Sequence, residues 1–414
     1  MRRGRKRQAM VADTPFHPVI AAVMYSPNLG DGVIAACIDH AIRQQFPAAQ
    51  PDWLDLAGRT DFPRQAPTGR QAAIKLMATL PSPVDQLLGE QMVRHQVRSR
   101  LEPLLTRILP SASALMLGGG QLLSDVHMNF PVKLAALSAR CEQSDIPMVI
   151  HGVGVAETWQ RRATALFLKL LGNRKLASVC VRDQASRENL LRHAGDQFSP
   201  NGRLDIRIAP DPAFLARDAF DLEASDAVTG RIGLGVTHPS ALQAHGEDAA
   251  PSGQAAVSNV AALASSLIAN GFCPVLFTNG AFEDESFLAR VIASEAFAEV
   301  RPRVEVARRV STPADLARLI AGFDGVIAHR LHANILSFAL GGVPVGLAWD
   351  AKMRGFFDLI GETGLLQASA CPDPVQTVAS LQDGLKRRAE MRQRADELSV
   401  AARAGVLESL DRVC

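Results

Sequence analysis

Four cationic side chains that could bind an anion lie at the ends of predicted strands. Arg182 ends the apolar segment ASVCVRD, Arg330 and His332 follow a short strand, and Lys352 follows the next one. In an open parallel sheet, ligand groups lie on the loops after the carboxyl ends of strands. Arg330 and His332 also stand at a predicted helix N-terminus, where unpaired N–H groups and the helix dipole favour an anion. The pattern predicts a cationic pocket.

Two of these side chains also have a purely structural explanation. Arg182 could form a salt bridge with Asp183, whose carboxylate could cap the following helix. His332 could instead pack in the core. The sequence favours the pocket because several cations follow strands of the same kind, and it leaves both alternatives open.

Polar and glycine-rich segments follow other predicted strands. They are NLGDG with Asn28 and Asp31, GGGQLLSD with Gly118, Gly119, Gly120 and Gln121, and HGVGV with Gly152. The three consecutive glycines are as consistent with a tight turn as with a loop that faces a ligand. Neither a GxGxxG pattern nor a Walker lysine is present, so we predict neither a dinucleotide fingerprint nor a P-loop.

The elements that must position these residues alternate between strand and helix. In the first half, buried strands are predicted over 18–26, 114–120, 147–155 and 177–183, and the segment 206–214 closes this half. The second half predicts strands over 231–237, 273–279, 303–309, 325–328 and 343–349. Buried apolar strands separated by helices imply an α/β fold with parallel sheets covered by helices.

The chain is long enough for two such domains. It has 414 residues, which exceeds the usual size of one hydrophobic core. We predict a basic disordered tail over 1–17, an N-terminal Rossmann-like domain over 18–220, a second one over 230–370, and helices over 374–414. Two parallel-sheet domains that face each other across a cleft are the expected architecture. The stretch 58–110 gives no clear pattern.

Composition excludes several classes of protein. Hydrophobic residues make up 47% and charged residues 21%, which is typical of a globular protein. The net charge is +2, but five basic residues gather in the first seven, and without them 39 basic residues face 42 acidic ones. A nucleic-acid-binding surface over the whole fold is therefore not expected. The six dispersed cysteines favour a reducing compartment, and no apolar run is long enough to span a membrane, so we predict a cytoplasmic protein.

The motifs together resemble a known family. The segments NLGD, GGGQLLSD, HGVGV, VRDQAS, DPAF and RLHANILSFALGGVPVGLAWDAKMRGF occur in the order of the polysaccharide pyruvyl transferase family, from about residue 24 to residue 361. The RLHA segment is the most specific part. The resemblance implies two Rossmann-like domains similar to GT-B glycosyltransferases. It also implies transfer of pyruvate from phosphoenolpyruvate to a sugar, as a ketal, in the synthesis of exopolysaccharides and cell-wall polymers.

The resemblance also implies roles for single residues. Arg182, Arg330, His332 and Lys352 are expected to form the phosphoenolpyruvate site in a cleft with an acceptor-side first domain and a donor-side second domain. Asp31 is expected to be a catalytic or acceptor-side carboxylate. Candidate contacts to the acceptor or its loops are Asn28, Gly118, Gly119, Gly120, Gln121 and Gly152. The chain departs from the family pattern in the first residue of HGVGV and in His329, and both departures concern the acceptor.

A reaction follows from these residue types as a hypothesis. His332, as imidazolium, would protonate the methylene carbon of the enol, and Asp31 would take a proton from an acceptor hydroxyl. Arg182, Arg330 and Lys352 would stabilise the departing phosphate. The scheme needs no metal and no cofactor, and no HExxH or DxD motif is present.

Two other classes of function are also consistent with the sequence. One is a GT-B-type glycosyltransferase that uses a nucleotide sugar, because Arg330 and Lys352 could bind a diphosphate. The other is a non-catalytic sugar-binding member of a polymer-assembly complex. The expected partners are phosphoenolpyruvate and a saccharide or lipid-linked oligosaccharide, with no nucleic acid. With a lipid-linked acceptor, the basic N-terminus could hold the protein at the inner face of the membrane.

Overall fold

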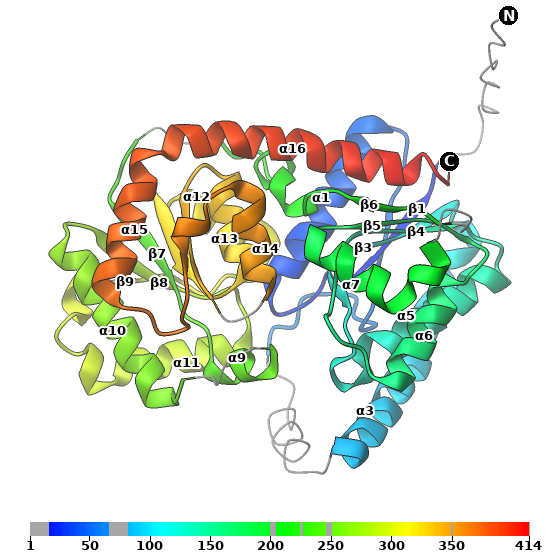
Figure 1. Cartoon of the computed structure of the whole chain (residues 1–414), viewed down its shortest axis with the longest axis horizontal. Coiled ribbons are helices and arrows are strands. Elements are labelled where there is room, and N and C mark those ends of the chain that lie inside the picture. Colours follow the sequence, from blue (N-terminus) through cyan, green and yellow to red (C-terminus); the bar gives the residue numbers. More distant parts are fainter. Residues whose placement is uncertain are drawn as a thin grey trace, which may run out of the picture.

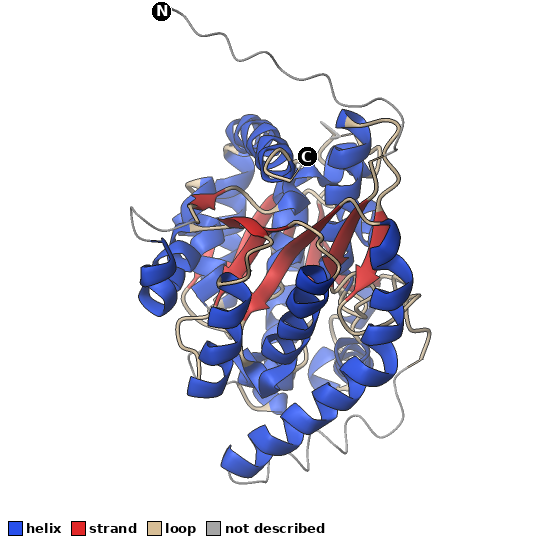
Figure 2. Cartoon of the chain, turned by 90° about the vertical axis from the view of Figure 1, so that its right-hand side faces the viewer, coloured by secondary structure: helices blue, strands red, loops and turns tan. Residues whose placement is uncertain are grey.

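The computed structural model describes residues 16–65, 82–198, 204–223, 227–245, 251–348 and 351–413. Within these residues the chain forms two six-stranded sheets with helices packed against them (Figures 1 and 2). All strand pairs in both sheets are parallel. The predicted α/β architecture with two parallel-sheet halves is therefore confirmed. No helix of the described part is both long and apolar enough to cross a bilayer.

The first sheet has the order β2-β1-β3-β4-β5-β6. Its strands are β1 (Pro18–Ala22), β2 (Asp52–Asp55), β3 (Ala114–Leu123), β4 (Met148–Val155), β5 (Leu176–Val181) and β6 (Ile206–Ile208). Its helices are α1 (Leu29–Gln45), α3 (Ser82–Gln96), α4 (Glu102–Ile108), α5 (Asn129–Gln143), α6 (Arg161–Leu171), α7 (Gln184–Ala194) and α8 (Ala216–Ala219), with a 3-10 turn η5 (Pro212–Leu215).

The second sheet has the order β12-β11-β10-β7-β8-β9. Its strands are β7 (Arg231–Gly235), β8 (Cys273–Phe277), β9 (Glu305–Val306), β10 (Gly325–Ala328), β11 (Val343–Leu347) and β12 (Leu366–Gln367). Its helices are α9 (Pro239–His245), α10 (Gly253–Ala269), α11 (Phe282–Ala293), α12 (Pro313–Ala321), α13 (Leu331–Ala339), α14 (Ala351–Ile360) and α15 (Pro374–Lys386).

Local sequence explains where several helices begin. The Asp183 carboxylate accepts a hydrogen bond from Ser186 N at 2.6 Å and caps α7. Thr312 and Asp315 form a reciprocal capping box at the start of α12. Such caps satisfy backbone N–H groups that the helix itself leaves without partners. They place the loops after β5 and before α12 in defined conformations.

An apolar core joins the two halves. Phe214 of η5 lies 6.1 Å from the ring of Phe338 and 6.2 Å from that of Phe356, which belong to the second half. Buried side chains of α1 belong to this same core, whereas the opposite face of the first sheet has a separate one. The halves are therefore packed against each other along η5 and α1.

The long helix α16 (Arg388–Leu410) runs across both halves (Figure 1). It contacts α13 in the second half and α1, β4 and η5 in the first. Near its end, Arg207 of β6 forms an ion pair with Glu408 at 2.8 Å. The helix thus fixes the orientation of one sheet relative to the other.

The structure describes only the end of the predicted basic tail, and it places the glycine-rich segments in regular elements. Residues 1–15 of the predicted basic tail lie outside the described residues, while Phe16 packs edge to face on Phe46, with ring centres 5.3 Å apart. The segment NLGDG follows a strand as expected, but it does not form a simple turn, because α1 already begins at Leu29. The strand predicted over 114–120 is confirmed and continues to Leu123, so Gly118, Gly119 and Gly120 lie in β3 and not in the turn or loop considered for them.

Candidate active site

The first turn of α1 meets the second half of the molecule directly. Leu29 N donates a 2.9 Å hydrogen bond to the Asn279 carbonyl, which follows β8. A Cβ atom on Gly30 would lie 2.5 Å from Cβ of His332, and one on Gly32 would lie 2.7 Å from Cγ of Pro313. Only glycine permits this approach, so the spacing Gly-Asp-Gly lets α1 begin against α13 and α12.

Asp31 projects from this turn into a group of cations. Asn28 Nδ2 lies 3.5 Å from the Asp31 carboxylate at the helix start. Burial raises the pKa of Asp31 above its ordinary value, although the charges of His332 and Arg330 act in the opposite direction. A carboxylate with a raised pKa is a stronger base once it is ionised.

His332 faces a carboxylate that sequence reasoning did not select. Its Nε2 atom lies 3.8 Å from Oδ2 of Asp211, which is too long for a hydrogen bond. Both atoms are buried, and neither has a hydrogen-bond partner among the described residues. Burial alone would raise the pKa of Asp211, but the neighbouring His332 and Arg182 lower it below its ordinary value. An ionised carboxylate therefore faces the imidazole ring.

Asp211 is held in place by its own loop. Its Oδ1 atom accepts a 2.9 Å hydrogen bond from Ala213 N and caps η5. Asp211 follows the edge strand β6 in the segment DPAF. That segment carried part of the family resemblance, so its position after a strand was the signal that could have singled out this residue.

Arg330 is fixed by a buried acid on α11. Two of its nitrogens, Nε and Nη2, donate to Oδ2 of Asp284 at 3.0 and 2.6 Å. Asp284 is fully buried, and its other oxygen accepts from His238 N at 2.8 Å. Burial acts to lower the pKa of Arg330, but Asp284 raises it above its ordinary value. The guanidinium thus stays charged and is held rigidly by a residue that sequence reasoning missed.

Arg182 forms the salt bridge that the sequence left open as its structural role. Its Nε atom pairs with Asp183 at 3.1 Å, and its Nη2 donates to Gln121 Oε1 at 2.8 Å. A Cβ atom on Gly154 would lie 2.8 Å from the guanidinium carbon, so this glycine makes room for the side chain. The predicted salt bridge with Asp183 is therefore present. Gln121 acts through Arg182.

Lys352 lies on a helix of the second half. It is half-buried in the first turn of α14. A Cβ atom on Gly355, one turn later, would lie 3.7 Å from the carboxyl carbon of Asp183. Helix α14 therefore borders the loop that carries Arg182, although the two belong to different halves.

The glycines within β3 and β4 have mainly structural roles. A Cβ atom on Gly118 would lie 2.6 Å from Ile38, and one on Gly119 would lie 2.1 Å from Ile34, so both let α1 pack closely on β3. Gly152 has φ of +65°, and a Cβ atom there would lie 3.0 Å from Pro212. Only Gly120, with no atom within 4 Å of its Cβ position, borders open space.

Two other histidines from the motif segments lie outside this cluster. His151 is fully buried beneath α16, where its Nδ1 atom lies 2.9 Å from Ser409 Oγ. His329 Nε2 lies 2.8 Å from the Ala370 carbonyl. Burial lowers the pKa of each to about 4. Both are therefore neutral near pH 7, and both support the fold.

The family model of polysaccharide pyruvyl transferases matches residues 28–351, which is most of the chain. The chain belongs to the polysaccharide pyruvyl transferase family. Every residue of the cluster around Asp31 and His332 except Lys352 lies inside that match. No curated protein matches the sequence.

Solved sugar-nucleotide enzymes share the fold of this family member. A putative UDP-N-acetylglucosamine 2-epimerase from Listeria monocytogenes has 7% identity and a TM-score of 0.55, with 96% of each chain covered. The S. aureus protein MnaA with UDP has 8% identity and a TM-score of 0.53, again with 96% of each chain covered. A UDP-glucosyltransferase from Polygonum tinctorium has 11% identity and a TM-score of 0.50, covering 97% of this chain and 99% of its own. At such identities the likeness shows the fold alone, which is GT-B-like.

The pyruvyl transferase cluster thus combines residues from both halves. Asp31, Arg182 and Asp211 come from the first half, and His332 and Arg330 come from the second. The charges of His332 and Arg330 act on Asp31, and those of His332 and Arg182 act on Asp211. Among the residues that the structure describes, no group of three or more His, Cys, Asp or Glu side chains is arranged to hold a metal ion.

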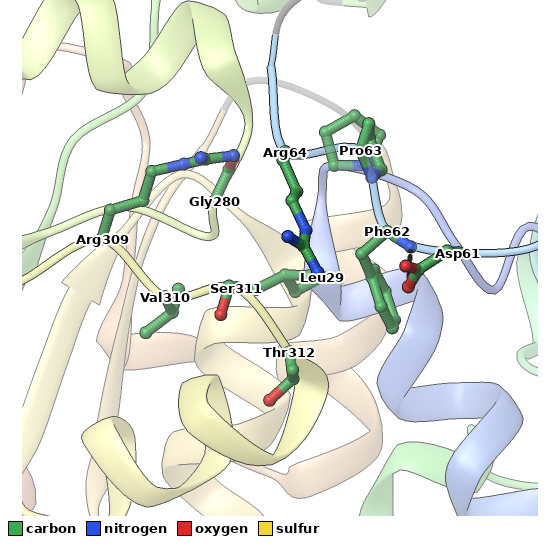
Figure 3. A pocket seen from close by; sticks show the side chains of 11 residues that line it. Leu29, Asp61, Phe62, Pro63, Arg64, Gly280, Arg309, Val310, Ser311 and Thr312 are labelled. Atoms are coloured by element: carbon green, nitrogen blue, oxygen red, sulfur yellow. Dashed lines mark hydrogen bonds between the residues drawn. The ribbon is translucent and has the colours of Figure 1, made fainter.

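A pocket of about 250 Å³ lies beside this cluster, between the two halves (Figure 3). Leu29 of α1 forms part of its wall. The segment 61–64 lines it from the first half, and Gly280 with residues 309–312 lines it from the second. The sequence reasoning named none of the residues in this pocket, because 61–64 belongs to the stretch that gave no clear pattern.

Proposed function

We propose that this protein transfers pyruvate from phosphoenolpyruvate to a sugar of an exopolysaccharide or cell-wall polymer precursor, forming a ketal and releasing phosphate. The observation that carries this proposal is the meeting of Arg182, Arg330 and His332 with the carboxylates Asp31 and Asp211 between the halves. Phosphoenolpyruvate carries a phosphate and a carboxylate and therefore requires several fixed cations. Arginine binds both groups in bidentate geometry.

The proposed reaction begins with protonation of the donor. The His332 imidazolium gives its proton to the methylene carbon, which becomes the methyl group, and C2 becomes electrophilic. Asp211, opposite Nε2, orients the ring for this step. Arg182, Arg330 and Lys352 stabilise the negative charge of the phosphate as it leaves.

The acceptor supplies two hydroxyl groups. Asp31 takes the proton of the first hydroxyl as its oxygen bonds to C2, and its raised pKa suits it to this role. The C2–O bond to phosphate then breaks, and the second hydroxyl of the same sugar bonds to C2 and closes the ring. Its proton leaves with the phosphate or to solvent. Donor and acceptor of this kind would be available in the cytoplasm.

The test separates donor binding from chemistry. Phosphoenolpyruvate is titrated calorimetrically into the wild-type protein and into K352A, which removes one of the cations proposed to bind the donor. We expect about tenfold weaker binding in K352A, since it loses one charged contact. R354A is the matched control, because Arg354 is exposed on the same helix and points about half a turn away.

His332→Gln tests the acid. We expect H332Q to bind phosphoenolpyruvate and to lose ketal formation by roughly 100-fold or more, because general acid catalysis contributes about that much. Retained turnover would exclude His332 as the proton donor. Saturable binding of UDP-sugars without binding of millimolar phosphoenolpyruvate would contradict the donor assignment and favour a glycosyltransferase.

A further inference from the structure

The pocket between the halves carries positive charge outside the donor cluster. Arg64 reaches into it from the first half, and Arg309 reaches into it from the second (Figure 3). Within the described residues, neither arginine forms an ion pair. Asp61 is the one acid that lines the pocket, and its Oδ1 atom accepts a 2.7 Å hydrogen bond from Phe62 N.

Arg309 is positioned before any ligand binds. Its guanidinium carbon lies 4.4 Å from the ring centre of Phe282, and its Nη2 atom lies 3.4 Å from the Gly280 carbonyl. Ser311 and Thr312 line the same wall. Thr312 and Asp315 cap each other at the start of α12, so the helix N-terminus is already satisfied and the two arginines are the groups that can bind an anion.

The remaining walls are apolar. Pro27, Leu29, Phe62, Pro63 and Val310 line the pocket. A wall of this kind suits an anion that is attached to an organic group better than it suits a free hydrated ion. The volume of about 250 Å³ is below the roughly 300–1,000 Å³ of whole small-molecule sites, so the pocket accommodates part of a ligand.

The pocket lies against the helical turn that carries Asp31, the residue proposed to act on the acceptor. Leu29 lines the pocket, while Gly30 contacts His332 and Asp31 lies in the same helical turn. A ligand in the pocket therefore contacts the helical turn that carries the proposed catalytic carboxylate. The acceptor must approach Asp31 by its hydroxyl groups, so the pocket can hold the part of the acceptor that extends away from them.

We propose that Arg64 and Arg309 bind the diphosphate through which the acceptor sugar is attached to its carrier. This inference rests on the proposed function, since it assigns the pocket to the acceptor of that reaction. Two arginines that meet at one site match the oxygens of a diphosphate. The carrier is either a lipid or a nucleotide, and the apolar wall beside the arginines contacts its first part.

The experiment uses the full chain with phosphoenolpyruvate present to occupy the donor site. Inorganic pyrophosphate is titrated calorimetrically into wild type, R64A and R309A. We expect one binding site in the wild type and at least about tenfold weaker binding in each variant, because each loses a charged contact. R308A is the matched control, because Arg308 is the exposed neighbour of Arg309 and does not line the pocket. Its affinity should match that of the wild type.

The same variants distinguish failure of this inference from failure of the proposed function. Phosphoenolpyruvate should bind R64A and R309A as it binds the wild type. Equal pyrophosphate affinity in wild type, R64A and R309A, or no binding at millimolar pyrophosphate, would overturn the pocket assignment while leaving the donor site intact. Arginine-dependent pyrophosphate binding without any phosphoenolpyruvate binding would support the anion pocket and contradict the donor.

Two further probes identify the carrier. Geranyl diphosphate represents a lipid carrier, and uridine diphosphate represents a nucleotide carrier. If one of the two probes binds more tightly than pyrophosphate and this binding is lost in R309A, the result supports the proposal and identifies the class of the carrier. Failure of both to bind would show that the pocket does not hold the acceptor.

Discussion

Two carboxylates that sequence reasoning missed determine how the site cations are held. Asp284 binds two nitrogens of Arg330, and Asp211 faces His332 across 3.8 Å. Each carboxylate is buried and is itself held by a backbone N–H group. Because rigid support of a reacting group lowers the cost of reaching the transition state, we expect these acids to position the reacting groups of the proposed reaction.

The substitution Asp211→Asn tests this positioning role. The amide oxygen can still accept from Ala213 N, so η5 should keep its cap. Loss of the negative charge opposite His332 should lower kcat by roughly 100-fold, as a misplaced catalytic group does. The dissociation constant of phosphoenolpyruvate should change little. Steady-state kinetics measures kcat and calorimetry measures the dissociation constant on the same preparation. A wild-type kcat in D211N would contradict the positioning role.

At the scale of elements, α16 contributes a pH-sensitive contact to the fold. Ser409 Oγ donates to the Gly405 carbonyl, so it accepts from His151 Nδ1 and from Arg207 Nη2. Burial and then the charge of Arg207 lower the pKa of His151 to about 4, although Asp211 acts in the opposite direction. The folded state therefore prefers neutral His151, whereas the unfolded chain binds a proton below about pH 6.5.

The free energy of unfolding should fall as the pH falls from about 6.5 to about 4. The contribution of His151 is fully present above about pH 6.5 and is lost progressively down to about pH 4. Between pH 7 and pH 5 the wild type should lose about 2 kcal/mol more unfolding free energy than H151Q does. Denaturant titration at the two pH values measures this. H95Q, which changes an exposed histidine on α3, should behave as the wild type does.

Much of this arrangement of elements follows from the sequence. The buried strands and the loops with Arg182 and Arg330 were predictable, because apolar runs alternate with amphipathic helices. The position of Gly30 against His332 was not, since it depends on how two distant segments pack. Asp284 lies in an acidic first turn of α11, a pattern that usually means only a favourable helix start. Arg64 lies in a stretch without periodicity, so its role required the structure.

At the scale of the whole molecule, one apolar core connects the two sheets. Phe214 is 1% exposed and packs against Phe338 and Phe356 of the other half. Sugar-nucleotide enzymes of similar fold also consist of two halves, but likeness of fold does not determine how the halves are joined. In this chain the aromatic cluster and α16 together connect the two halves, and we therefore expect the halves to unfold together.

Phe214→Ala tests that coupling. Removing this ring should lower the unfolding free energy by about 3–5 kcal/mol, as is typical of a buried phenylalanine. Hydrogen exchange should speed up in strands of both sheets. F167A is the comparison, because Phe167 is equally buried but packs on the outer face of the first sheet. Faster exchange in only one sheet of F214A would show that the halves are energetically independent.

Helix α16 also has a consequence for the order of synthesis. It follows every strand of both sheets in the sequence, yet it covers His151 on β4 and contacts α1. A ribosome therefore completes both sheets before the helix that holds them together leaves it. Until then the surface that α16 will cover stays accessible to water and to chaperones. We expect the final relative orientation of Asp31 and His332 to be reached once α16 has packed onto the two halves that the apolar core joins.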